Sequence, residues 1–543
     1  MNGGANNLTL NNSGVATLNG AVSGTGTLSA SGAGALEVNN NITGGNVSDR
    51  ESTTLNGTGG SETVTTTGGD QNYTAQVTLG AATTLNAGTI ELAGVTGGAN
   101  NLRLNNSGLA KLNGAVSGTG TLTANGAGAL QVGNNITEGN VNDSESTTLN
   151  GTGGSETVTT TGGDQNYTAQ VTLGAATTLS SGTIELVGVT GGGNNLALDN
   201  SGLAKLNGAI SGAGTLTANG TGALQVNNNL AAGNINDNEG TTLNGAGGSE
   251  VVTTTGSQAY NGAVVQGANA HLTGGSLAVG STWDAQNHDL ELTFGSSVKV
   301  PAFANVVNFT SDGTGGTTIN GTFATSGNQT YNNVVTLGGS STLQGVNITF
   351  GSSVAGGGQD LTLNNSGAAT LSSSGATGLG LLTIGTPPAG GGGTMQLNGS
   401  IRGNSVVDWE NTTFAEPTST LTSPTVATTG KQTYNGPLTL GANTYLAGSP
   451  LPTINNSVNA NGYSLILEFL TGGRIFDSNL AADEDERRIL GSIAPRVKKG
   501  QVKIITPFPG KRVIKEPGYL KGSSDVPLEP GTETYSLYST LVD

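Results

Sequence analysis

Short runs in which apolar and polar residues alternate dominate the first 473 residues of this chain. Leu8-Thr-Leu10, Ala35–Val38, Ala75–Leu79 and Thr89–Leu92 are examples, and each is bounded by Gly, Asn, Ser or Asp. Alternation with period two between such turn residues predicts short β-strands. No helical periodicity of useful length occurs before residue 478. The pattern therefore predicts an all-β fold made of many short strands.

The same strand pattern recurs in blocks of 94 residues. Ser52–Leu85 is repeated letter for letter at Ser146–Leu179, and an Asn-Asn-Leu-x-Leu phrase places Leu8, Leu102 and Leu196 in one phase. A fixed period of this kind indicates stacked repeats. We divide the chain into repeats at residues 1–96, 97–190 and 191–283, diverged repeats at 284–473, and a non-repeat cap or tail at 474–543.

A finer spacing of about 20 residues, as from Leu8 to Leu28 and from Leu18 to Val38, predicts the coil of a solenoid. Each block then corresponds to four or five coils. Strands in successive coils must pair in parallel, and parallel crossovers are right-handed in nearly all proteins. We therefore predict a right-handed parallel β-helix of roughly 24 coils, on the order of 110 Å long at the usual strand spacing.

Residues from Arg474 onward differ in composition. Asp483–Leu490 is predicted to be a short helix, with acids early and arginines late. Gln501–Thr506 alternates like a strand, and several prolines follow. Because the ends of solenoids need polar caps, a mixed C-terminal cap is the leading interpretation; a disordered extension and a separate module are the alternatives.

Composition narrows the class of protein. Gly accounts for 93 of 543 residues, charged residues for only 10% and aromatic residues for 4%, which favours a thin core repeated along one axis. Cysteine is absent, so disulfides and thiolate metal sites are excluded. The net charge of −17 lies almost entirely before residue 474 and disfavours binding to nucleic acid or anionic lipid.

We predict neither a signal peptide nor a membrane-spanning helix from this sequence. The first residues lack the basic and apolar regions of a signal peptide, and we expect the chain to be a piece of a longer protein or a reading frame that begins within a repeat. The longest apolar stretch, near Tyr463–Leu470, is too short to span a membrane as a helix.

Catalytic motifs are missing from the sequence. The only histidines are His271 and His288, and we expect His288, with Asp284 and Asp289 nearby, to be a solvent-facing strand residue. No zinc, phosphate-loop or serine-hydrolase motif occurs. We predict no catalytic residues, no metal site and no cofactor.

Some parallel β-helices cleave polysaccharides with clustered carboxylates. Here the acids Glu62, Asp70 and Glu91 reappear 94 residues later as Glu156, Asp164 and Glu185, as scaffold residues would. Trp283 and Trp409 are the only tryptophans, so aromatic platforms for sugars are lacking. The recurring tyrosines are expected to pack at coil corners. These are Tyr73, Tyr167, Tyr260, Tyr331 and Tyr434.

One recurring phrase resembles a known family. It occurs at Val64–Leu85, Val158–Leu179, Val252–Leu272, Phe323–Leu343 and Val426–Leu446, the last reading VATTGKQTYNGPLTLGANTYL. It resembles the repeat regions of filamentous-haemagglutinin-like exoproteins, which are bacterial adhesins exported by two-partner secretion. The resemblance covers residues 1–473 and implies a parallel β-helix on, or released from, a Gram-negative surface. The secretion domain of the family and a C-terminal membrane barrel are not found in the sequence.

The leading hypothesis is a non-enzymatic adhesive segment, extracellular or at the bacterial cell surface, that acts in attachment, aggregation or biofilm formation. Its expected partners are host-cell or surface glycans and proteins, further copies of itself, and an outer-membrane transporter during export, with no nucleic acid and no membrane insertion. The alternatives are a polysaccharide-degrading β-helix, a disordered low-complexity segment and an ice-binding solenoid. The ligand, the binding face and the export route cannot be read from the sequence.

Overall fold

The computed structural model describes residues 1–300, 303–387, 392–415, 424–469, 500–505 and 532–537. It is a parallel β-solenoid of about 22 turns, which confirms the predicted fold class. This number is slightly smaller than the predicted 24. The difference arises because the coils vary in length. The paired residues Leu36 and Thr53 lie 17 positions apart, whereas Ala369 and Met395 lie 26 apart.

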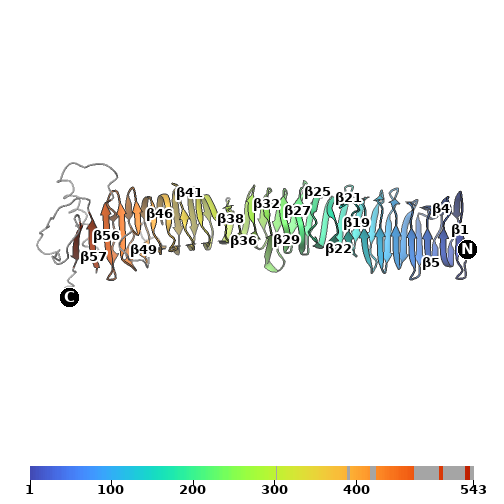
Figure 1. Ribbon diagram of the computed structural model, residues 1–543, viewed down its shortest axis with the longest axis horizontal. Helices are drawn as coiled ribbons and strands as arrows, with labels where there is room; N and C mark the ends of the chain where they lie inside the picture. The colour runs from blue at the N-terminus through green and yellow to red at the C-terminus, as the bar shows by residue number, and fades with distance from the viewer. Residues whose placement is uncertain (301–302, 388–391, 416–423, 470–499, 506–531, 538–543) are drawn as a thin grey trace. The chain divides into compact units, whose positions relative to one another are not determined.

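Residue contacts divide the chain into two compact units, Met1–Ser281 and Thr282–Asp543. In each unit the strands of successive coils lie side by side (Figure 1). The described residues contain no α-helix; a 3-10 turn at Ala246–Gly248 is the exception to the strand-and-turn pattern.

Three parallel sheets form the sides of the first unit. Sheet I contains β1 (Leu8–Leu10), β3 (Val22–Ala30), β5 (Ile42–Asp49), β8 (Asp70–Tyr73), β11 (Thr89–Leu92), β14 (Leu109–Leu112), β17 (Ala129–Val132) and β20 (Ser146–Leu149). Sheet II contains β2 (Val15–Leu18), β4 (Ala35–Val38), β6 (Ser52–Leu55), β9 (Val77–Leu79), β12 (Val95–Thr96), β15 (Val116–Ser117), β18 (Ile136–Glu138), β21 (Ser155–Thr160), β23 (Ala176–Ser181) and β25 (Leu196–Asn200). Sheet III contains β7 (Ser61–Thr66), β10 (Ala82–Ala87), β13 (Leu102–Asn106), β16 (Thr121–Ala124), β19 (Asn140–Asp143), β22 (Asp164–Leu173), β24 (Thr183–Thr190), β26 (Leu203–Leu206), β28 (Ala223–Val226), β30 (Gly240–Leu243) and β33 (Val264–Gln266).

Long strands bend at a corner and contribute to two sheets. β3, β5, β22 and β24 all begin in sheet III and continue into sheet I. Sheet I extends through β27 (Ile210–Ala218), β29 (Leu230–Asp237), β31 (Ser249–Thr254) and β34 (Asn269–Gly274). Sheet II extends through β27, β29, β32 (Ser257–Tyr260) and β35 (Ser276–Val279).

The 94-residue block is not a whole number of turns. From Leu102, four steps along sheet III lead through Leu122, Val141 and Gln165 to Ile184. The chain then crosses sheet I before it reaches Leu196 in sheet II, the counterpart of Leu102. A block therefore makes about four and two-thirds turns. As a result Leu8, Leu102 and Leu196 lie in three different sheets.

The second unit has the same parallel pairing. Its strands include β36 (Trp283–Phe294), β38 (Phe303–Asp312), β39 (Thr317–Ala324), β40 (Gln329–Tyr331), β41 (Val335–Gly345), β42 (Ile348–Phe350), β44 (Leu361–Asn365), β45 (Ala368–Leu371), β46 (Ala376–Ile384), β47 (Thr394–Leu397), β48 (Ile401–Asp408), β49 (Asn411–Phe414), β50 (Val426–Thr428), β51 (Gln432–Tyr434), β53 (Thr444–Gly448) and β56 (Ser464–Phe469). Near the C-terminus β57 (Gly500–Ile505) pairs in parallel with β56 and antiparallel with β58 (Thr532–Leu537). The helix predicted at Asp483–Leu490 lies outside the described residues.

Alternating side chains fill a narrow core. In β10 the pattern places Thr83, Leu85 and Ala87 inside, and Leu85 has no exposed surface. Burial of such apolar side chains is the main favourable term in the folding of each coil. In the second unit, aromatic rings take over much of this core. Phe309 lies 4.9 Å from Phe323 and 5.6 Å from Tyr331, measured between ring centroids.

Candidate functional site

The structure places His288, Asp284 and Asp289 on one strand, as predicted. The two aspartates are hydrogen-bonded to asparagines of the next coil. His288 is half-buried on β36, and the neighbouring Asp284 and Asp289 accept hydrogen bonds from the next coil. Asn305 Nδ2 donates to Asp284 Oδ1 at 2.9 Å, and Asn308 Nδ2 donates to Asp289 Oδ1 at 2.9 Å. Hydrogen bonds from the Asn305 amide and from the backbone N–H of Gln286 lower the pKa of Asp284, which is partly exposed.

The repeated acids fall into two groups. Asp70 accepts a hydrogen bond from Thr89 Oγ1 at 2.7 Å and Asp164 from Thr183 Oγ1 at 2.6 Å, both on the outer surface. Glu91 and Glu185 likewise receive bonds from Asn113 and Asn207. Glu62 and Glu156, in contrast, point inward and are 1% exposed. Among the described residues no group of three His, Cys, Asp or Glu side chains is arranged to hold a metal ion.

A recurring buried motif, Asp-x-Glu-x-Thr, occupies the corner between two strands. Its four copies are Asp49/Glu51/Thr53, Asp143/Glu145/Thr147, Asp237/Glu239/Thr241 and Asp408/Glu410/Thr412, and all of these side chains are at most 3% exposed. In each copy an asparagine of an earlier coil contacts the glutamate. These partners are Asn12, Asn106, Asn200 and Asn365. We call each motif with its asparagine an acidic corner.

The aspartate of an acidic corner turns the chain. Asp143 Oδ1 accepts the backbone N–H of Glu145 at 2.9 Å, and its other oxygen accepts the hydroxyl of Thr147. A carboxylate that captures the amide two residues later forms an Asx-turn, which mimics a backbone turn. The chain therefore leaves β19 and enters β20 around this side chain.

The glutamate of an acidic corner joins three successive coils. Glu145 Oε1 accepts the N–H of Gly126 at 2.6 Å, one coil back, and Glu145 Oε2 accepts Asn106 Nδ2 at 2.9 Å, two coils back. The same Asn106 amide contacts the carbonyl oxygens of Gly108 at 2.7 Å and Ala129 at 3.2 Å. These bonds satisfy backbone groups at a corner where the ladder is interrupted.

Glycine is required where the coils meet at these corners. A Cβ on Gly126 would lie 2.0 Å from the carbonyl oxygen of Asn106, and one on Gly128 would lie 1.7 Å from that of Gly108. No side chain fits at such distances. Part of the high glycine content is thus explained by close approach of neighbouring coils.

A second recurring device pairs a buried glutamine with a buried tyrosine. Gln165 Nε2 donates to the carbonyl oxygens of Val158 at 2.7 Å and Ser180 at 2.9 Å, and Tyr167 Oη contacts Gln165 Oε1 at 3.4 Å. The five tyrosines of the recurring phrase are 0–2% exposed, in agreement with the predicted packing. Tyr167 pairs with Asp143 in register, so this device borders the acidic corner.

Burial raises the pKa of the four corner aspartates, of the corner glutamates Glu145, Glu239 and Glu410, and of the interior glutamates Glu62, Glu156 and Glu250. The pKa is about 6 for Asp143, about 7 for Asp408 and about 7 for Glu410. It is about 7 for Glu62 and about 8 for Glu156. Removal from water disfavours the charged form, and the hydrogen bonds described above offset this only in part.

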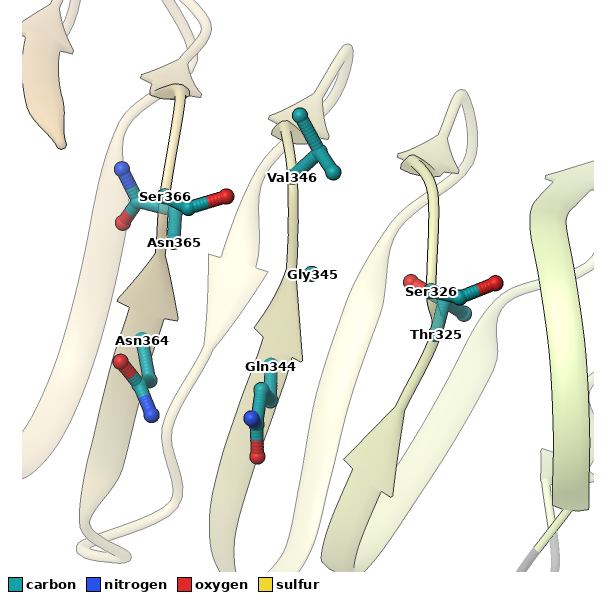
Figure 2. Close-up of a pocket in the computed structure, with 8 residues that line it drawn as sticks. All are labelled: Thr325, Ser326, Gln344, Gly345, Val346, Asn364, Asn365 and Ser366. Atoms are coloured by element: carbon teal, nitrogen blue, oxygen red, sulfur yellow. The ribbon is translucent and has the colours of Figure 1, made fainter. Parts of the chain in front are cut away.

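A shallow polar hollow of about 240 Å³ lies on three successive coils of the second unit (Figure 2). Its lining residues are Thr325, Ser326, Gln344, Gly345, Val346, Asn364, Asn365 and Ser366. The lining offers amides and hydroxyls but no ionisable group. Gly345 pairs with Asn365 at the position that Ala87 and Ser181 occupy beside Asn106 and Asn200, and a Cβ on Gly345 would lie 2.8 Å from Thr325 Oγ1.

Comparisons with protein families, curated proteins and solved structures give no match to this chain. No helix in the described part of the chain has the length and apolar character needed to cross a membrane. The acidic corners were missed from the sequence, where only Glu62, Asp70, Glu91 and their counterparts were interpreted, as scaffold residues. The signal of buried acids is present nonetheless: the corner residue Asp49 continues the inward phase of Val47, and the interior residue Glu62 continues that of Val64.

Proposed function

We propose that this chain is a non-catalytic adhesive segment that presents repeated polar surfaces to cell-surface glycans or proteins, or to further copies of itself. The observation that carries the proposal is the one-third-turn offset between blocks. Outward residues of the same sequence emerge from sheets I, III and II in turn, so one surface motif faces several directions. Repetition of weak contacts raises the overall affinity without any new contact type.

The chemistry of the outer surface supports this role. Threonine, asparagine and serine side chains dominate it, as in the Asn105–Asn86 and Asn39–Asn19 pairs, whose amides bond at 2.8 and 2.9 Å. Such groups donate and accept hydrogen bonds to hydroxyl-rich or peptide surfaces. The resemblance to filamentous-haemagglutinin-like exoproteins supports an extracellular or bacterial cell-surface location and export by two-partner secretion.

The test removes one whole block. Deletion of residues 97–190 joins Thr96 to Gly191 and thereby keeps the sequence of a natural block junction, because Thr190 is the counterpart of Thr96. The purified full-length and deleted chains are coated on beads and offered to epithelial cells, to glycan arrays and to uncoated surfaces. The proposal predicts that the deleted chain adheres more weakly than the full-length chain. Absence of binding to all these surfaces, or release of sugars from the glycans, would contradict it.

A further inference from the structure

The buried carboxyl groups of the solenoid lie among neutral hydrogen-bond donors. In the fourth acidic corner, Asp408 accepts the N–H of Glu410 at 3.0 Å and the hydroxyl of Thr412 at 2.6 Å, while Glu410 accepts Asn365 Nδ2 at 3.0 Å. None of these contacts comes from Lys or Arg. Asp408 has no exposed surface and Glu410 is 2% exposed. Two ionised carboxylates there would be desolvated and uncompensated.

The titratable groups that face the corners add to the free-energy cost of ionising the buried carboxyl groups. Glu410 repels Asp408 within the motif, and the Tyr434 phenol lies against Asp408 from the next coil. In the third corner Asp199 adds repulsion to Glu239. In the first two corners Tyr73 and Tyr167 interact electrostatically with both the corner aspartate and an interior glutamate. Arg50, the basic residue inside the first motif, is exposed.

The interior glutamates have the same surroundings. Glu62 Oε2 accepts the N–H of Gly57 at 2.7 Å, and its other oxygen has no hydrogen-bond partner. Glu250 has no exposed surface, and the backbone N–H of Gly245 is the group that favours its charged form. A protonated carboxyl group needs no counter-charge at such a position, whereas a carboxylate does.

We propose that the acidic corners and the interior glutamates make the cohesion of neighbouring coils depend on bound protons, so that the solenoid is held most tightly in acidic solution and loosens as the pH rises to neutral. The proposal concerns the stability of the coils and is independent of the proposed adhesive function. The pH response is assigned to the four acidic corners acting together along the solenoid.

The direction follows from the pKa values. The folded state raises the pKa of Asp408 from 3.8 to about 7 and that of Glu410 from 4.5 to about 7, so it binds protons more tightly than the unfolded chain. Stability is therefore fully present below about pH 4 and is lost as the pH rises through about 7. Basic groups at the corner would have produced the opposite trend.

The experiment measures amide hydrogen exchange of the full chain at pH 5, 7 and 8.5, with each rate divided by that of the unstructured peptide at the same pH. The segments that carry the fourth corner, residues 361–371 and 401–414, have unique sequences. We expect their opening equilibrium to rise by at least tenfold, and by up to several hundredfold, between pH 5 and 8.5, since one pKa unit corresponds to about tenfold.

The double variant Asp408→Asn with Glu410→Gln removes both titrating groups and is expected to flatten this profile. Asp360→Asn is the matched control, because Asp360 is an exposed acid of the same unit whose Oδ1 accepts the N–H of Leu381 at 2.7 Å. That control should keep the wild-type profile. A wild-type opening constant that does not change from pH 5 to 8.5 would overturn the proposal. So would a wild-type profile in the folded double variant; if the double variant does not fold, the wild-type profile alone decides.

Discussion

Replacement of Asn365 by alanine tests whether the bridging asparagines hold coils together. Asn365 Nδ2 lies 3.0 Å from the carbonyl oxygen of Gly367, 3.2 Å from that of Thr394 and 3.0 Å from Glu410 Oε2. An amide nitrogen carries two hydrogens, so these three contacts amount to about two hydrogen bonds. Asn365→Ala leaves three buried acceptor oxygens without the hydrogen-bond donor that they share.

The expected cost follows from this count. An unsatisfied buried polar group costs about 1–3 kcal/mol, and Asn365 also lines the adjoining hollow (Figure 2). We therefore expect a loss of about 2–3 kcal/mol, which corresponds to an increase of roughly 30- to 150-fold in local opening. The loss should be confined to nearby coils, because a solenoid is stabilised by nearest-neighbour contacts.

Hydrogen exchange is the suitable assay, since long repeat arrays do not unfold in one step. Exchange should accelerate in residues 361–371 and 394–414 and remain unchanged near the N-terminus. Asn364→Ala is the matched control, because Asn364 is the preceding residue on the same strand and faces outward. If Asn365→Ala exchanges no faster than Asn364→Ala in these segments, the bridging role is wrong.

Two further substitutions test other parts of the packing. Gly128→Ala should destabilise the chain by about 1–3 kcal/mol or prevent folding, because the new Cβ would lie 1.7 Å from the Gly108 carbonyl oxygen; Gly20→Ala, which has nothing within 4 Å, should leave the thermal melt by circular dichroism unchanged. Phe309→Ala should cost about 3–5 kcal/mol by removing a ring that is 1% exposed and packed on Phe323 and Tyr331. Hydrogen exchange in residues 303–331 measures this loss, and a smaller effect in Phe309→Leu is the expected control; equal exchange in all three chains would contradict the assigned core.

The sequence predicts the coil well because each coil is specified locally. The 20-residue spacings from Leu8 to Leu28 and from Leu18 to Val38 are the pairings that the structure shows. A side chain in a strand alternates between inside and outside, so a two-residue pattern fixes both the strand and its inner face. Stacking then needs no contact between distant parts of the chain.

The interior polar residues are harder to predict. Glu62 and Glu91 lie in the same block and both recur after 94 residues, yet one is 1% exposed and the other is half-buried on the outer surface. Recurrence alone does not separate them, whereas strand phase does. Glu62 shares the inward phase of Val64, but Glu91 lies between the inward-facing Ile90 and Leu92 and therefore faces outward. The partners of the acidic corners lie one and two coils away, and the sequence does not show which glycine or asparagine will meet which glutamate.

The fractional number of turns per block has a consequence for stability. The first acidic corner lies where sheet I passes to sheet II, the second where sheet III passes to sheet I, and the third where sheet II passes to sheet III. Each of the three edges of the first unit thus receives one set of bonds that spans three coils. A block of a whole number of turns would place all three sets on one edge and leave the other two edges without them. We infer that the 94-residue period distributes the acidic corners around the solenoid axis. Each of the three edges is thereby stabilised by side-chain bonds in addition to what the thin core supplies.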